Sequence, residues 1–190
     1  IALLGVFGVF GGNKDNKNPI ASITPAGMSK IEIEANLSTN GLRNIEFAGV
    51  SSDIIVTRTN SNTISVKLTG NARVAPDLIA EKNGSRGTFE VKWPKSIINN
   101  SRDMKMEVFL PVNYQENVSF RSVSGDITLT ERSTFDEVTF NTVSGDIRNR
   151  DTSSTSYSAS TVSGDQILSN IFSKDASLSS ISGNIQYKGS

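Results

Sequence analysis

The chain contains no cysteine and no histidine among its 190 residues. It therefore lacks a thiolate nucleophile, an imidazole base and the usual ligands of a structural zinc ion. Lysine plus arginine and aspartate plus glutamate number 19 each, so the net charge gives no basic surface for nucleic acid. These absences favour a protein that is not an enzyme and that needs no cofactor, no metal and no nucleic-acid partner.

Proline and long hydrophobic runs are also scarce. No proline follows Pro111, which is typical of a chain whose N–H groups nearly all donate to a sheet. The apolar run IALLGVFGVFGG (residues 1–12) would make roughly 18 Å of helix, against a hydrocarbon core of roughly 30 Å. A truncated membrane anchor, a signal remnant and a buried strand remain open for it. We expect an anchor or signal remnant over 1–12 and a polar tether over 13–30.

Beyond the tether, apolar and polar residues alternate in short segments, as in strands with one buried face. Residues 77–82 (DLIAEK) are the only segment here for which we allow a helical turn. The expected strands are Ile31–Glu34, Asn44–Phe47, Asp53–Thr57, Thr63–Leu68 and Thr88–Trp93. The pattern predicts an all-β chain.

The C-terminal part repeats one six-residue phrase four times. SVSGDI begins at Ser122 and returns as TVSGDI, TVSGDQ and SISGNI, with glycines spaced by 20, 19 and 19 residues. Residues 118–190 thus hold four clear repeats, and residues 49–56 (GVSSDIIV) resemble a degenerate earlier one. Such a period predicts stacked units that cannot fold singly, because one unit buries too few apolar side chains to offset its ordering entropy.

Apolar positions recur in columns around each phrase, and we expect these columns to line the interior of a stack. They are Val118, Val138, Tyr157 and Ala176; Phe120, Phe140, Ala159 and Leu178; Val123, Val143, Val162 and Ile181; and Ile127, Ile147, Gln166 and Ile185. The predicted fold over 31–190 is a single-stranded β-solenoid, β-helix-like, with coils of roughly 19–20 residues.

The Ser-Gly-Asp/Asn triplets are interpreted as structural repeat turns, in which glycine takes a positive φ and the serine and aspartate side chains accept N–H groups. An alternative is a cation held along the stacked carboxylates. A catalytic role is disfavoured because a catalytic site needs one asymmetric cluster and this aspartate recurs in each coil. The turn residues are Ser124, Gly125, Asp126, Ser144, Gly145, Asp146, Ser163, Gly164, Asp165, Ser182, Gly183 and Asn184.

For two further groups of residues, both a functional and a structural interpretation are possible. Glu131, Asp136 and Glu137 resemble the carboxylate pairs of glycoside hydrolases, but a solvated loop is the preferred interpretation. Trp93 with Tyr114 could form a sugar-stacking platform, although an ordinary core or rim aromatic is preferred.

The run from Met104 to Ile127, with its Leu110-Pro111, its Tyr114 and its Val123-Ser-Gly-Asp turn, resembles the toast-rack or putative-adhesin domain of bacterial cell-envelope proteins. The resemblance covers roughly residues 31–190. It implies a β-helix-like domain displayed outside the cell by an N-terminal membrane anchor. Similar domains accompany Lia-type envelope-stress systems, some linked to sensing membrane-active peptides. Gln166 departs from the apolar pattern, and we expect a bulge there.

The expected function is a non-enzymatic, membrane-tethered extracytoplasmic binding or scaffold domain in envelope stress or surface adhesion. Its expected partner is an envelope component, a membrane-active peptide or a protein, and its solenoid ends offer a route to self-association. Two alternatives stay open: a polymerising bactofilin-like scaffold and a β-helical enzyme acting on polysaccharide.

Overall fold

The fold is built from β-strands stacked in coils. The computed structural model describes residues 27–94 and 101–190, so the expected anchor over 1–12 and residues 13–26 of the tether lie outside the described residues. All regular secondary structure within the described ranges is strand. The strands are β1 (Ser29–Ser38), β2 (Asn44–Ala48), β3 (Asp53–Thr59), β4 (Thr63–Ala72), β5 (Asp77–Asn83), β6 (Arg86–Lys92), β7 (Ser101–Pro111), β8 (Asn117–Ser122), β9 (Ile127–Leu129), β10 (Ser133–Thr142), β11 (Ile147–Thr161), β12 (Gln166–Ser180) and β13 (Ile185–Gly189).

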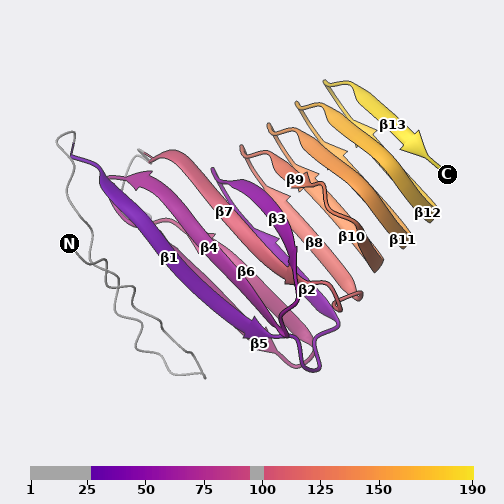
Figure 1. Cartoon of the computed structure of the whole chain (residues 1–190). Helices are drawn as coiled ribbons and strands as arrows, with labels where there is room; N and C mark the ends of the chain where they lie inside the picture. The colour runs from indigo at the N-terminus through magenta and orange to yellow at the C-terminus, as the bar shows by residue number, and fades with distance from the viewer. Residues whose placement is uncertain (1–26, 95–100) are drawn as a thin grey trace.

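All thirteen strands belong to one sheet that folds into two faces (Figure 1). One face runs β5, β6, β2, β8, β10 and then the second halves of β11 and β12. The other runs β1, β4, β7, β3, β9, the first halves of β11 and β12, and β13. Most pairs between coils are parallel, as an all-β solenoid requires. The predicted fold class is confirmed.

The two faces meet where β11 and β12 bend. Asp151 and Asn170 have φ values of 57° and 55°, a region that Asn and Asp tolerate better than other non-glycine residues. The Nδ2 group of Asn170 donates to Asp151 Oδ1 at 2.8 Å, so the bends of adjacent coils are tied to each other. Each strand can therefore continue from one face to the other without a loop.

A column of stacked aromatic rings runs through the interior. The centroids of Phe89, Phe47, Phe120 and Phe140 follow each other at 5.3–5.4 Å, and Tyr157 continues the column at 5.7 Å from Phe140. All five side chains are buried. The predicted columns that begin at Val118, Phe120 and Ile127 are confirmed in register.

The prediction that Val123, Val143, Val162 and Ile181 line the interior is wrong. These side chains stack in register but point outward, because they stand at the turn apex between the two faces. The bulge expected at Gln166 is also wrong. Gln166 lies buried in the ladder opposite Ile147 and Ile185, and its Nε2 group donates to the Ser179 carbonyl.

The N-terminal half of the stack does not follow chain order. β2 pairs on one side with β6 and on the other with β8, while β3 lies between β7 and β9. The segment from 44 to 59 is therefore a coil inserted between two coils formed by later residues. Residues 49–56 are part of a solenoid coil, as expected, whereas the helical turn allowed over 77–82 is wrong. That segment is β5, which forms a hairpin with β6.

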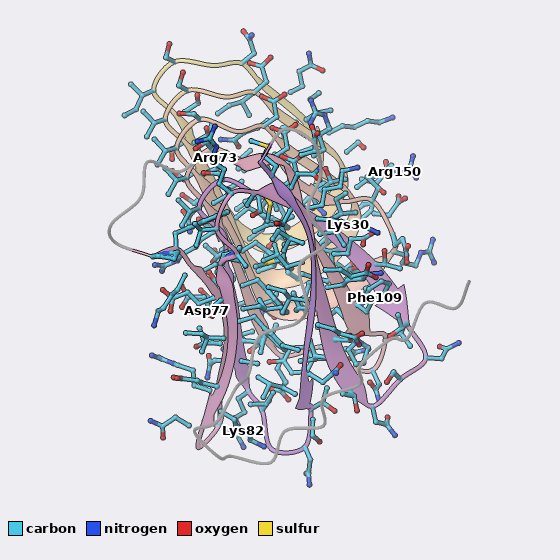
Figure 2. All side chains as sticks on the ribbon, turned by 90° about the vertical axis from the view of Figure 1, so that its left-hand side faces the viewer. Lys30, Arg73, Asp77, Lys82, Phe109 and Arg150 are labelled. Atoms are coloured by element: carbon cyan, nitrogen blue, oxygen red, sulfur yellow. The ribbon has the colours of Figure 1, made fainter. Side chains whose placement is uncertain are left out.

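The two ends of the stack differ. At one end β1 and β5 contact each other, and β1 carries Glu32, which pairs with Lys67 at 2.9 Å and Lys30 at 3.4 Å. The hydrogen bond from Lys67 and the nearby charges lower the pKa of Glu32. Figure 2, seen from this side, shows Asp77 and Lys82 pointing away from the core. At the other end every residue of β13 is exposed.

Candidate functional site: the edge of repeated turns

The turn glycines are required by the distance between coils. A Cβ added at Gly145 would lie 2.1 Å from the carbonyl oxygen of Gly125, and one at Gly125 would lie 2.0 Å from that of Ser52. Gly164 and Gly183 repeat this geometry. None of the four has a positive φ, so the expected backbone reason is wrong. Glycine is needed because the backbone of the coil beneath occupies the place of a side chain.

The first residue of each phrase holds its turn. Thr142 Oγ1 accepts the Gly145 N–H at 3.1 Å and donates to the Gly125 carbonyl of the coil beneath at 3.3 Å. Ser122 does the same with Gly125 and Ser52, at 2.9 and 3.3 Å. The side chains of both are buried, so their hydroxyls satisfy groups that water cannot reach. The sequence prediction missed this role, although the repeated Ser or Thr at the start of the phrase was the available signal.

The turn aspartates form a ladder along the stack. Asp53 Oδ1 accepts the Asp126 N–H, Asp126 Oδ1 accepts the Asp146 N–H, and Asp146 Oδ1 accepts the Asp165 N–H, at 2.9–3.0 Å. Asp165 in turn accepts the Asn184 N–H at 2.8 Å. Each aspartate carboxylate thus accepts a backbone N–H, as predicted, and the N–H belongs to the next coil.

Arg148 reduces the repulsion within this ladder. Its guanidinium donates to Asp126 Oδ2 and Asp146 Oδ2, each at 2.6 Å. The hydrogen bond to Asp126 and the two negative charges raise the pKa of Arg148. Sequence analysis did not single out Arg148, although it stands two residues after an aspartate of the repeat, on the same side of an extended strand.

A cation along the ladder was the alternative interpretation of these aspartates. Each Oδ1 atom from Asp53 to Asp165 is occupied by a backbone N–H, and Arg148 takes one Oδ2 atom of each of two carboxylates. Across residues 27–94 and 101–190 no three acidic side chains are placed to hold a metal ion. The geometry supports a structural ladder.

The serines of the Ser-Gly-Asp triplets lie on the surface. Ser124, Ser144, Ser163 and Ser182 are exposed, and the backbone N–H of each donates to the carbonyl of the valine in the preceding turn, at 2.8–3.0 Å. These bonds keep the turns aligned. The exposed edge therefore presents one apolar residue, one serine and one acidic or amide residue per coil.

A shallow groove of about 450 Å³ runs beside this edge. Gly49, Val123 and Val143 line it on the turn side, and Arg121 and Asn141 line it on the side of the strands. Arg121 pairs with Glu46 at 3.2 Å, so the charge beside the groove is balanced. The groove and the outward valines occupy the same region of the molecule.

The acidic residues considered for glycoside hydrolysis lie on the surface, and the contacts of two of them are to backbone groups. Glu131 Oε2 accepts the backbone N–H of Arg58 at 2.9 Å, and the backbone N–H of Asp136 donates to the Gln115 carbonyl at 2.7 Å. Glu131, Asp136 and Glu137 are all exposed. Glu131 lies between β9 and β10, and Asp136 and Glu137 lie within β10, so the preferred interpretation as solvated surface residues fits their exposure.

The aromatic platform considered as an alternative for Trp93 and Tyr114 is not assembled, and the preferred interpretation of both residues holds. Trp93 follows the end of β6 on the side of the repeated turns, whereas Tyr114 follows the end of β7 on the opposite edge. Tyr114 is buried, its hydroxyl donates to the Asn117 carbonyl at 3.3 Å, and burial raises its pKa. Both side chains belong to the core or its rim, and Trp93 packs against the core.

Arg58 stabilises this opposite edge. Its Nη2 group donates to the carbonyls of Val112 and Tyr114 at 3.2 and 3.1 Å, and its guanidinium carbon lies 5.0 Å from the ring centre of Phe135. Burial lowers the pKa of Arg58 to about 10. The residue remains charged at neutral pH and fixes the connection between β7 and β8.

Comparison with known proteins identifies a matching family and solved structures with a similar fold. The profile of the family Toastrack DUF4097 matches residues 42–190. A crystal structure of a putative cell adhesion protein from Clostridium sporogenes is similar at 10% identity, with a TM-score of 0.55, covering 85% of this chain and 100% of that one. A putative adhesin from Parabacteroides distasonis has 9% identity and a TM-score of 0.42, with coverages of 84% and 79%.

A search of curated proteins found no match. The solved structures are too distant in sequence to indicate more than the fold. The family match spans most of the chain and includes all four repeats and the inserted coil. The chain therefore belongs to the Toastrack family.

Proposed function

We propose that the chain is a non-enzymatic binding or scaffold domain on the extracytoplasmic face of the cell envelope, held there by the N-terminal segment. Its role would lie in envelope stress or surface adhesion, with an envelope component, a membrane-active peptide or a protein as partner. One observation carries this proposal: the carboxylates that repeat along the turn edge are used in backbone hydrogen bonds, which leaves a rigid, regular surface.

Family membership and the described surface support the proposal. A solved structure with a similar fold is described as a putative cell adhesion protein. The described residues contain no helix long and apolar enough to cross a membrane, and the anchor is proposed for residues outside them.

Protease added to intact cells that express the full-length parent tests the location. We expect the domain to be digested from outside while a cytoplasmic marker survives. Digestion only after lysis would contradict the extracytoplasmic proposal. In parallel, purified protein incubated with cell-wall polysaccharide should release no sugar. Release that disappears in Glu137→Gln would instead support the glycoside-hydrolase alternative.

A polymerising scaffold is the second candidate, because the exposed strand β13 has a free edge that can pair with another chain. Sedimentation of the purified chain without any partner distinguishes the two. A polymer should pellet at micromolar concentration, whereas a binding domain should stay in the supernatant.

A further inference from the structure

An unbroken apolar ridge follows the turn edge. It consists of the outward side chains Val50, Val123, Val143, Val162 and Ile181, which are 38–47% exposed in the first four coils and 82% exposed in the last. All five positions hold a β-branched apolar residue, and a serine follows each one. Because the coils are about 4.8 Å apart, the ridge is about 19 Å long.

The stacking of neighbouring turns explains only part of this pattern. A β-branched residue suits an extended backbone and packs on its neighbour, but threonine would meet both needs and keep a hydroxyl in water. The part of each valine that remains exposed forms a continuous apolar strip, and the groove lined by Val123, Val143 and Asn141 lies directly beside it. An apolar strip of this kind marks an interaction site.

Charge differs on the two sides of the ridge. Three residues after each of the four valines comes a carboxylate of the ladder, from Asp53 to Asp165. Arg148 pairs with two of these four, and by register Lys105 lies beside Asp53, so negative charge is in excess. On the other side Arg121 is balanced by Glu46. A complementary partner would be apolar along its centre and basic along one flank.

The spacing of the ridge favours a helix over a strand as this partner. Apolar residues three and four apart on an α-helix are separated by about 4.5 and 6.0 Å along its axis, which brackets the spacing of the coils. Side chains on one side of a strand are about 6.6 Å apart and lose register after two coils. About 13 helical residues would span the ridge.

We propose that the turn edge binds a basic amphipathic α-helix, whose apolar face lies on the valine ridge and whose basic flank faces the aspartate ladder. This inference rests on the proposed function, because it names the partner class of the proposed binding domain. Its assay uses purified protein, whereas the location is tested on cells, so failure of one leaves the other standing.

The test is fluorescence anisotropy of a labelled Leu/Lys amphipathic peptide of about 14 residues with the full chain. Two peptides serve as controls: a Leu/Glu version and a scrambled Leu/Lys version with no apolar face. We expect only the amphipathic Leu/Lys peptide to bind, and to bind more weakly at high salt, because its charges face exposed carboxylates. Equal binding of the Leu/Glu or the scrambled peptide would overturn the proposal.

Variants of the ridge provide the matched comparison. The triple change Val123→Thr, Val143→Thr and Val162→Thr keeps the β-branched shape and should weaken binding by about tenfold or more. Val112→Thr with Phe172→Thr removes apolar side chains of similar exposure away from the turn edge and should leave binding unchanged. Asp165→Asn keeps an oxygen for the Asn184 N–H and should reduce both binding and its salt dependence.

Other occupants of the ridge would give different results. If the triple variant binds the peptide as wild type does but loses self-association in sedimentation, the ridge is covered by a second copy and the proposal is wrong. If it loses only binding to neutral phosphatidylcholine vesicles, the partner is a lipid surface and the proposal is equally wrong. Thermal unfolding of each variant confirms that the fold is retained.

Discussion

The coils after residue 117 and those before it have the same cross-section but different construction. From β8 to β13 the chain adds one coil after another. The first turn lies on the turn of the inserted coil, and each later turn lies on the turn that precedes it in sequence. From β1 to β7 the chain forms the antiparallel pairs β1–β4, β4–β7 and β5–β6. It also encloses β2 and β3 between later strands (Figure 1). One interior can therefore be assembled by local stacking or by long-range insertion.

The difference also explains why the repeat is visible in only one part. In the C-terminal coils successive turns must fit each other, and the same glycine, hydroxyl and aspartate solve that problem each time. In the inserted coil Ser52 occupies the place of the glycine, and only Asp53 keeps the ladder contact. The inserted coil stacks on a repeat on one side only, so it needs fewer of the residues that fit one repeat turn to the next.

The largest loss of stability should follow removal of the Phe120 ring, which joins the two parts of the stack. Phe120 stacks between Phe47 of the inserted coil and Phe140 of the next, and it is fully buried. Phe120→Ala should lower the free energy of unfolding by about 3–5 kcal/mol. Leu178→Ala, in the same column near the open end, should cost less than half as much because Leu178 is only partly buried. Urea unfolding measures both, and equal losses would mean that the end coils are as tightly packed as the junction.

Replacing a glycine by alanine should lower stability in both parts of the molecule, but for different reasons. Gly145→Ala places a Cβ against the Gly125 carbonyl and should cost about 3 kcal/mol, because the backbone of two coils must separate. Gly84→Ala, in the β5–β6 hairpin, meets no atom within 4 Å and should cost about 1 kcal/mol through its φ of 58° alone.

Asparagine substitutions separate these two causes, since asparagine tolerates a positive φ. Gly84→Asn should recover most of the stability lost in Gly84→Ala, whereas Gly145→Asn should be no better than Gly145→Ala. Thermal unfolding compares the four variants. Recovery at position 145 would show that φ, and not space, requires glycine in the stack.

The buried hydroxyl of the turn should have an intermediate effect. Thr142→Val keeps the shape of the side chain but leaves the Gly145 N–H without its acceptor, and we expect a loss of about 1–2 kcal/mol. Thr139→Val, on the same strand but only half-buried, should change stability little and serves as the control. Hydrogen exchange of the Gly145 amide should rise in the first variant only.

The smallest effect should come from the ladder charge. Asp146→Asn keeps an oxygen for the Asp165 N–H but loses the ion pair with Arg148, which is partly exposed, so we expect a loss below about 1 kcal/mol. The loss should shrink at high salt. Asp146→Ala removes the acceptor as well and should cost more. A large loss in the asparagine variant would assign the stabilising role to charge and not to the backbone hydrogen bond.

Sequence reasoning predicted the coil length, most strands and three of the four columns, because a side chain's face alternates with its position in a strand. It failed for the column of Val123, Val143, Val162 and Ile181. In the repeat these residues look like core residues, since an apolar periodicity cannot tell an inward side chain from one at the apex of a turn. It also failed for Gln166, which keeps its register because backbone pairing holds it despite its polar side chain.

By itself, the sequence determined that the chain would form stacked β-coils with a turn at each Ser-Gly-Asp/Asn, since the repeat of 19–20 residues alternates apolar and polar residues and shows no helical pattern. Only the tertiary structure decided that β2 and β3 lie between later strands and that the valines of the turns face solvent. It also decided that the turn glycines are needed because the backbone of the neighbouring coil leaves no space for a Cβ. The physical reason is that backbone hydrogen bonds join strands regardless of their side chains. The order and spacing of the coils therefore appear only when the whole stack is assembled.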